Sequence, residues 1–169
     1  SNKDTNTAWG GANWISQSFT AAGSTNVVEA LLYLKYNTGT AADITVSIYS
    51  DSTGVPGTSL CSATLSAISD TNYAWREVFF STPITLTAAT VYHIVLSSAS
   101  SGTSAYHWGV DATSPSFTGG NLSTSANSGG AWSGDTAKDA CFILYTGTPV
   151  SFSNLQIYKE FGALLFSQG

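Results

Sequence analysis

The chain has 169 residues, of which 43% are hydrophobic, 12% aromatic and 9% charged, with a net charge of −5. This length predicts a single domain, and the apolar content excludes an intrinsically disordered chain. With five Lys and Arg residues in total, the chain lacks the basic surface of an ordinary nucleic-acid-binding protein. Its apolar runs fall far short of the ~20 residues of a transmembrane helix, so no membrane span is expected.

Along most of the chain, apolar and polar side chains alternate with a period of two, as in half-buried antiparallel strands. In chain order, strands are predicted near residues 13–20, 27–36, 43–50, 58–67, 73–81, 84–87, 90–98, 104–110, 117–124 and 139–146. Segments rich in Gly, Asn, Asp and Ser separate them at short intervals, and Pro83 suits a strand start or a sheet edge. The sequence therefore predicts an all-β fold, an antiparallel β-sandwich that is jelly-roll-like.

The strand near residues 27–36 shows the alternation most clearly. One face carries Val28, Ala30, Leu32, Leu34 and Tyr36, and the other carries Glu29, Leu31, Tyr33 and Lys35. The first face suits a core and the second a partly solvated surface.

The two ends of the chain differ from the sandwich, which we place at residues 13–147. Residues 1–12 are small and polar and are predicted to form an N-terminal arm. Residues 148–169 form a C-terminal extension with eight large apolar side chains: Phe152, Leu155, Ile157, Tyr158, Phe161, Leu164, Leu165 and Phe166. Such a segment suits contact with a partner chain, by addition of a strand to a sheet edge, or a fold-back onto its own domain.

Two cysteines, Cys61 and Cys141, lie 80 positions apart in predicted strands. We predict that they lie on neighbouring strands and can form a disulfide, with two buried thiols as the alternative. Two cysteines and two distant histidines do not match the ligand spacing of a zinc site.

The order of several short motifs is also informative. Ile44–Tyr49 precedes Thr53–Thr58, Trp75 precedes Val78-Phe79-Phe80, and the chain continues through Thr90–Leu96 to Asp139–Tyr145. This order resembles the choice-of-anchor R type β-sandwich module, over about residues 9–147. The resemblance implies a non-catalytic surface role, as in secreted microbial surface proteins and phage structural proteins, and it transfers no catalytic residues.

Motifs for known nucleophiles, phosphate loops, dinucleotides and zinc proteases are absent from the sequence. His93 and His107 each lie opposite an apolar row, where a surface or hydrogen-bonded histidine is expected. Asp111, Asp135 and Asp139 are the acidic residues we consider for a hydrolase, but their spacing does not show a paired site. We therefore expect no enzyme activity, no metal and no cofactor, with a loop Ca²⁺ site as the weaker alternative.

The aromatic residues give the clearest binding signal, because indole and phenol rings stack well on the apolar faces of sugars. The candidates for glycan contact are Trp9, Trp14, Tyr73, Trp75 and Trp132, and packing in the core is the alternative for each. By its alternation with Tyr106 and Val110, Trp108 is predicted to be core.

Together these patterns favour a non-enzymatic structural or assembly module of an extracellular, cell-surface or virion structure. Its expected partners are copies of itself or other surface proteins. The alternatives are a carbohydrate-binding module that uses the exposed aromatic residues and, more remotely, a small hydrolase.

Overall fold

The computed structural model describes residues 5–113, 117 and 120–147. This part of the chain forms two antiparallel β-sheets and contains no helix, which confirms the predicted all-β sandwich. The strands are β1 (Thr5–Trp9), β2 (Gly11–Thr20), β3 (Thr25–Tyr36), β4 (Ile44–Ser52), β5 (Val55–Leu65), β6 (Ala74–Leu86), β7 (Val91–Ser98), β8 (Tyr106–Asp111), β9 (Leu122–Ser125), β10 (Ser133–Asp135), β11 (Asp139–Ala140) and β12 (Phe142–Thr146).

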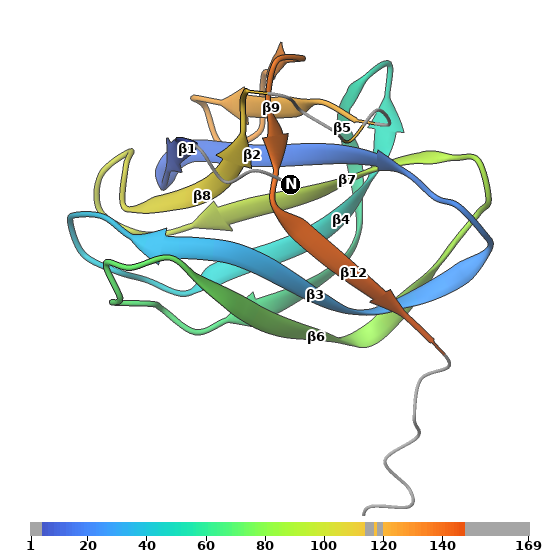
Figure 1. Cartoon of the computed structure of the whole chain (residues 1–169), viewed down its shortest axis with the longest axis horizontal. Helices are drawn as coiled ribbons and strands as arrows, with labels where there is room; N and C mark the ends of the chain where they lie inside the picture. The colour runs from blue at the N-terminus through green and yellow to red at the C-terminus, as the bar shows by residue number, and fades with distance from the viewer. Residues whose placement is uncertain (1–4, 114–116, 118–119, 148–169) are drawn as a thin grey trace, which may run out of the picture.

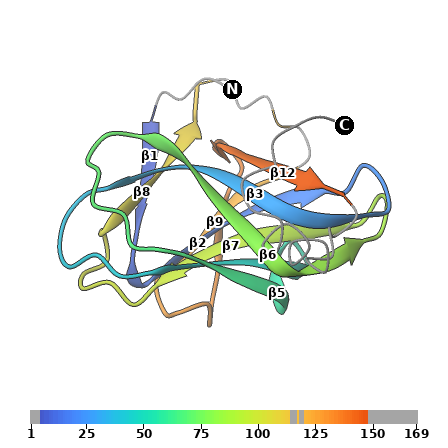
Figure 2. The same cartoon turned by 90° about the horizontal axis from the view of Figure 1, so that it is seen from below.

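The first eight strands follow jelly-roll order. Strand β1 pairs with β8, β2 with β7, β3 with β6 and β4 with β5, as in one long hairpin that has been rolled up. The roll produces sheet A, with the order β1-β8-β3-β6, and sheet B, with the order β2-β7-β4-β5. In Figure 1 β3 and β12 of sheet A lie in front of β4 and β7, and Figure 2 shows the two layers edge-on.

The last strands extend both sheets of this roll. Strands β9 and β10 continue sheet B beyond β2. Strand β11 pairs with β8 and strand β12 pairs with β3, so Cys141, which connects them, lies between β8 and β3 of sheet A. The backbone of Cys141 joins them, because its N–H donates to the Gly109 carbonyl and its carbonyl accepts from the Tyr33 N–H.

Between the sheets, the inward side chains form one apolar core. Strand β3 contributes Ala30, Leu32 and Leu34, and β8 contributes Trp108, all with no exposed surface. The face of β3 that carries Ala30, Leu32 and Leu34 is therefore the core face, as its alternation predicts. Trp108 is buried as expected, and its Nε1 donates to the Cys141 carbonyl at 2.9 Å.

The predicted N-terminal arm is wrong for residues 5–12. Residues 5–9 form β1, which pairs along its whole length with β8, and Trp9 is completely buried against Tyr106. Polar side chains of β1 gave no alternation strong enough to predict a strand. The predicted C-terminal extension, residues 148–169, lies outside the described residues together with its eight apolar side chains.

A single strand, β6, replaces the two strands predicted at 73–81 and 84–87. Its register against β3 shifts between the Val27–Ile84 and Glu29–Phe79 pairs, which leaves residues 80–83 as a bulge. Pro83 lies in this bulge on an edge strand, where its missing N–H removes no ladder hydrogen bond.

The two cysteines are not on neighbouring strands, and that prediction is wrong. Cys61 lies on β5 at the edge of sheet B, opposite Ile48, whereas Cys141 lies between β11 and β12 in sheet A. Neither forms a disulfide in the described structure. Strand alternation placed both residues in predicted strands, but it carried no information about which sheet each strand joins.

One buried polar contact links the two sheets. Gln17 on β2 of sheet B has no exposed surface, and its Oε1 accepts the Ala140 N–H of sheet A at 2.8 Å. Its Nε2 lies 3.4 Å from Oδ1 of Asp139, to which it donates. A buried amide of this kind stabilises the fold only while its partners remain in place.

Replacing Gln17 with leucine should lower the free energy of unfolding by about 1–3 kcal/mol, because the buried Ala140 N–H loses its acceptor. Urea denaturation followed by tryptophan fluorescence measures this. Thr64→Val at an exposed position of β5 is the control and should change stability by less than about 0.5 kcal/mol. Equal stability of the Gln17→Leu protein and the original would show that the link contributes nothing.

Candidate functional site

Exposed apolar side chains gather on the outer face of sheet A. We define the contact face as ten outward residues of β3, β6, β12 and the residue before β6: Glu29, Leu31, Tyr33, Lys35, Tyr73, Trp75, Glu77, Phe79, Ile143 and Tyr145. Four of the six exposed large apolar side chains in the described part of the chain belong to it: Trp75, Phe79, Ile143 and Tyr145. Single exposed apolar residues are ordinary, but a contiguous group of them marks a contact surface.

Strand register orders the contact face into rows. Leu31 on β3 pairs with Glu77 on β6 and with Ile143 on β12. The next row pairs Glu29 with Phe79 and Tyr145 in the same way. Cross-strand partners lie on one side of a sheet, with Cβ atoms about 5 Å apart, so each row is a continuous strip of surface.

Three aromatic rings form a cluster at one end of this face. Tyr33 stacks on Tyr73 with ring centroids 5.1 Å apart and lies 5.2 Å from the Trp75 ring. Gly109 makes room for the Tyr33 ring, since a Cβ there would meet Tyr33 Cδ1 at 2.7 Å. The cluster therefore holds the half-exposed Trp75 indole in a fixed place.

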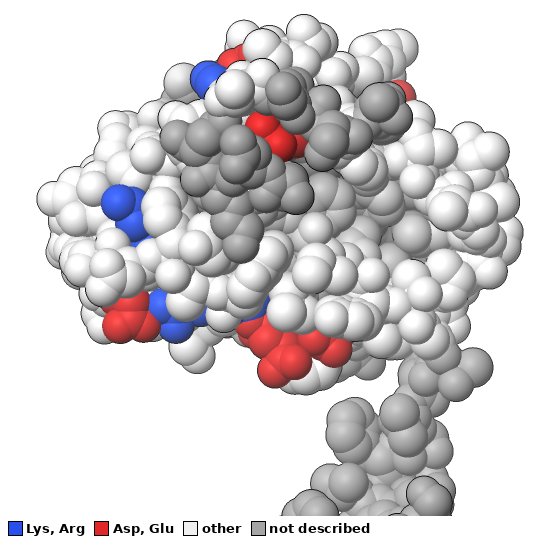
Figure 3. All heavy atoms as spheres, in the orientation of Figure 1, with Lys and Arg blue, Asp and Glu red and all other residues white. Residues whose placement is uncertain are grey.

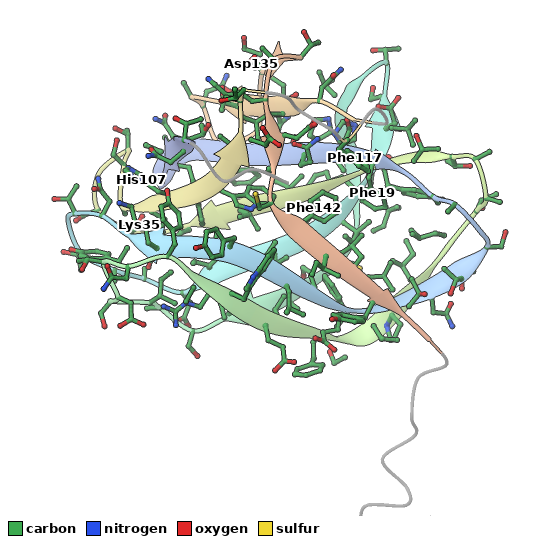
Figure 4. All side chains as sticks on the ribbon, viewed as in Figure 1. Phe19, Lys35, His107, Phe117, Asp135 and Phe142 are labelled. Atoms are coloured by element: carbon green, nitrogen blue, oxygen red, sulfur yellow. The ribbon has the colours of Figure 1, made fainter. Side chains whose placement is uncertain are left out.

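Lys35 and His107 border the aromatic cluster. They are cross-strand partners, and Figure 4 shows them side by side at one end of sheet A. The Lys35 ammonium lies 5.0 Å from the centre of the Tyr73 ring, within the range of a cation–π contact. Burial, with smaller effects of Tyr33 and Cys141, raises the pKa of Tyr73 to about 12, so its hydroxyl stays neutral.

At the other end of the contact face, two carboxyl groups lie together. Partial burial raises the pKa of Glu29, and the hydrogen bond and charge of Glu77 raise it further. Among the described residues, neither glutamate forms an ion pair with a lysine or arginine. Figure 3 shows that most of the surface around the few charged groups is uncharged.

The five candidates for glycan contact are distributed over three places. Trp9 is core and unavailable to a ligand, which corrects its assignment as a contact residue. Tyr73 and Trp75 belong to the contact face. Trp14 on β2 and Trp132 just before β10 both lie close to Gly129 and belong to sheet B. The Gly129 backbone, at φ 85°, approaches the Trp14 ring too closely for a side chain.

A shallow depression on sheet B adjoins Trp14. Hydroxyl-bearing residues line it beside the indole: Thr45, Ser97, Ser98 and Ser128. An aromatic face beside several hydroxyl groups suits a polar ligand with an apolar side. This depression is a second candidate site, separate from the contact face.

His93 is buried on β7 and forms a hydrogen bond from Nε2 to Asp51 Oδ1, at 2.8 Å. Burial lowers the pKa of His93, although the Asp51 carboxylate partly opposes this effect. Partial burial favours a higher pKa for Asp51, but hydrogen bonds from His93 and from the Gly54 N–H outweigh it and lower the pKa. Because the imidazole has no solvent access, we assign the pair a structural role.

The acidic residues considered for a hydrolase do not converge on an open cleft. Asp111 and Asp139 are cross-strand partners but are buried, and Asp139 accepts the Phe117 N–H at 3.1 Å. Asp135 lies on β10 and forms an ion pair with Lys138 at 2.9 Å. Nowhere in the described residues do three or more His, Cys, Asp or Glu side chains form a metal-binding group.

In comparisons with known proteins, no protein-family model and no curated protein matches the chain. The described residues also include no helix with the length and apolarity to cross a membrane.

Sequence reasoning missed Tyr33, the ring that joins Tyr73 to Trp75. The signal was present, because Tyr33 shares the outward face of its strand with Glu29, Leu31 and Lys35. The sequence did not reveal that β6 and β12 would place further aromatic residues on either side of this face.

The His93–Asp51 pair should make stability depend on pH. A folded-state pKa below the ordinary value of 6.5 means that the unfolded chain binds the proton more readily. The contribution of His93 to the free energy of unfolding is therefore fully present above about pH 6.5. This contribution declines as the pH falls below that value. Urea midpoints between pH 8 and pH 5 measure the decline, and His93→Asn should reduce its slope. An unchanged slope in that variant would assign the dependence to other groups, such as His107.

Proposed function

We propose that this chain is a non-enzymatic structural module of an extracellular, cell-surface or virion assembly, and that it binds other protein surfaces through the contact face. The observation that carries the proposal is the clustering of Trp75 and Phe79 on β6 with Ile143 and Tyr145 on β12, the two strands that pair with β3 on either side. Burying such a face removes apolar surface from water, which is the main driving force of protein association.

Two further features support an assembly role. The chain has few charges, so closely packed copies or partners meet little like-charge repulsion. Sheet A also presents a broad surface made from regular strands, and side chains on such strands are held more precisely than side chains on loops. The resemblance to choice-of-anchor R type modules agrees with a surface role without catalysis.

The double variant Phe79→Ser, Tyr145→Ser should remove the association of the full chain with its partner surface. Both side chains are exposed, so the fold loses little packing while the contact face loses much of its apolar area. Sedimentation velocity at increasing protein concentration measures association of the unmodified chain and the variant.

Leu60→Ser is the matched control, because Leu60 is also exposed but lies on β5 of sheet B. It should leave association unchanged. Equal association of the double variant and the unmodified chain would contradict the proposal, provided that the two have the same melting temperature.

A carbohydrate-binding function is the second candidate, and the depression beside Trp14 is the observation that favours it. If this function is correct, Trp14→Phe should weaken retention in affinity electrophoresis through gels that contain soluble polysaccharide, because the indole offers the larger stacking surface. Trp75→Phe is the control on the opposite sheet. Absence of retention for the unmodified chain across a panel of polysaccharides would reject the depression as a glycan site.

A further inference from the structure

The contact face carries opposite charges at its two ends. Glu29 and Glu77 lie together at one end, and Lys35 lies at the other. Of the three described lysines and arginines, Arg76 pairs with Asp70 and Lys138 with Asp135, which leaves Lys35 without a carboxylate partner in the described structure. The face thus holds an unmatched cation and two unmatched carboxyl groups, separated by aromatic and aliphatic side chains.

We propose that the partner of the contact face is a second copy of this chain, bound face to face about a two-fold axis. In a two-fold interface each contact occurs twice, so the surface must be complementary to itself. The contact face meets this condition, because rotation by half a turn brings its basic end over the acidic end of the other copy. This inference rests on the assembly role proposed above and specifies its partner.

The positions along β3 fit such an axis. Glu29 and Lys35 are equally distant from Leu32, so two antiparallel β3 strands facing each other place each Lys35 over the other copy's Glu29. The same operation places Leu31 over Tyr33 in both directions, which packs apolar side chains at the centre. Facing sheets pack about 10 Å apart, a gap that lysine and glutamate side chains can span together.

A second copy accounts for the charges better than a glycan does. A neutral sugar would cover the aromatic rings but would leave Lys35, Glu29 and Glu77 without charged partners. Within one copy, Glu29 and Lys35 are six residues apart on a strand, about 20 Å, which is too far for an ion pair. A partner with the inverse arrangement of charges brings a lysine to the acidic end of the face and a carboxylate to Lys35, and the chain itself supplies that arrangement.

Charge-reversal variants of the full chain test the proposal. Lys35→Glu places like charges at both ends of the two-fold interface, and so does the double variant Glu29→Lys, Glu77→Lys. The affinity of each protein for itself should be at least about tenfold lower than that of the unmodified chain, since two attractive pairs become repulsive. Mixed in equal amounts, the two proteins should associate again, because every pair is then of opposite charge. Lys138→Glu, a reversal outside the contact face, is the control and should associate like the unmodified chain.

Sedimentation velocity of each variant and of the mixture gives the result. Recovery in the mixture supports the face-to-face dimer. Failure of the mixture to recover, when the single proteins are weakened, overturns it, as does a monomeric unmodified chain at every concentration. If association is lost in Phe79→Ser, Tyr145→Ser but is insensitive to all the charge reversals, the contact face binds protein in another geometry, and only the two-fold pairing is rejected.

Discussion

The register of β3 is the constraint on which both the core and the contact face depend. This strand pairs with β6 on one edge and with β12 and β8 on the other, so its register fixes the positions of three other strands. Because side chains alternate across a strand, the register that buries Leu32 and Leu34 also turns Tyr33 and Lys35 outward. A slip of one residue would exchange the two sets, and burial of the apolar set opposes that slip strongly.

Much of the fold could be predicted from the sequence because apolar alternation reports directly on half-buried strands. It located β2 to β8 within a few residues and identified the core face of β3. It failed for β1, whose side chains are mostly polar and whose strand form comes from pairing with β8 rather than from its own pattern. The cysteine prediction failed for a related reason: alternation describes each strand alone, whereas the distance between Cys61 and Cys141 is set by sheet topology.

The candidate site was predictable only in part. The abundance of aromatic residues was visible, and Tyr73 and Trp75 do lie together on the surface. Which aromatic residues share a face depends on long-range register, and so the sequence could not separate the buried Trp9 from the exposed Trp75. The same register brings Glu29 next to Glu77, residues 48 positions apart in the chain. The proposed protein contact rests on the composition of this face.

Hydroxyl-radical footprinting of the full chain, dilute and concentrated, shows whether the contact face becomes buried between copies. Phe79 is 63% exposed on the contact face, and Leu60, which is 41% exposed on β5, serves as an internal reference. We expect oxidation of Phe79, Trp75 and Tyr145 to fall with increasing protein concentration while oxidation of Leu60 stays constant. Equal oxidation of the contact face at all concentrations, or protection of Leu60 instead, would contradict it.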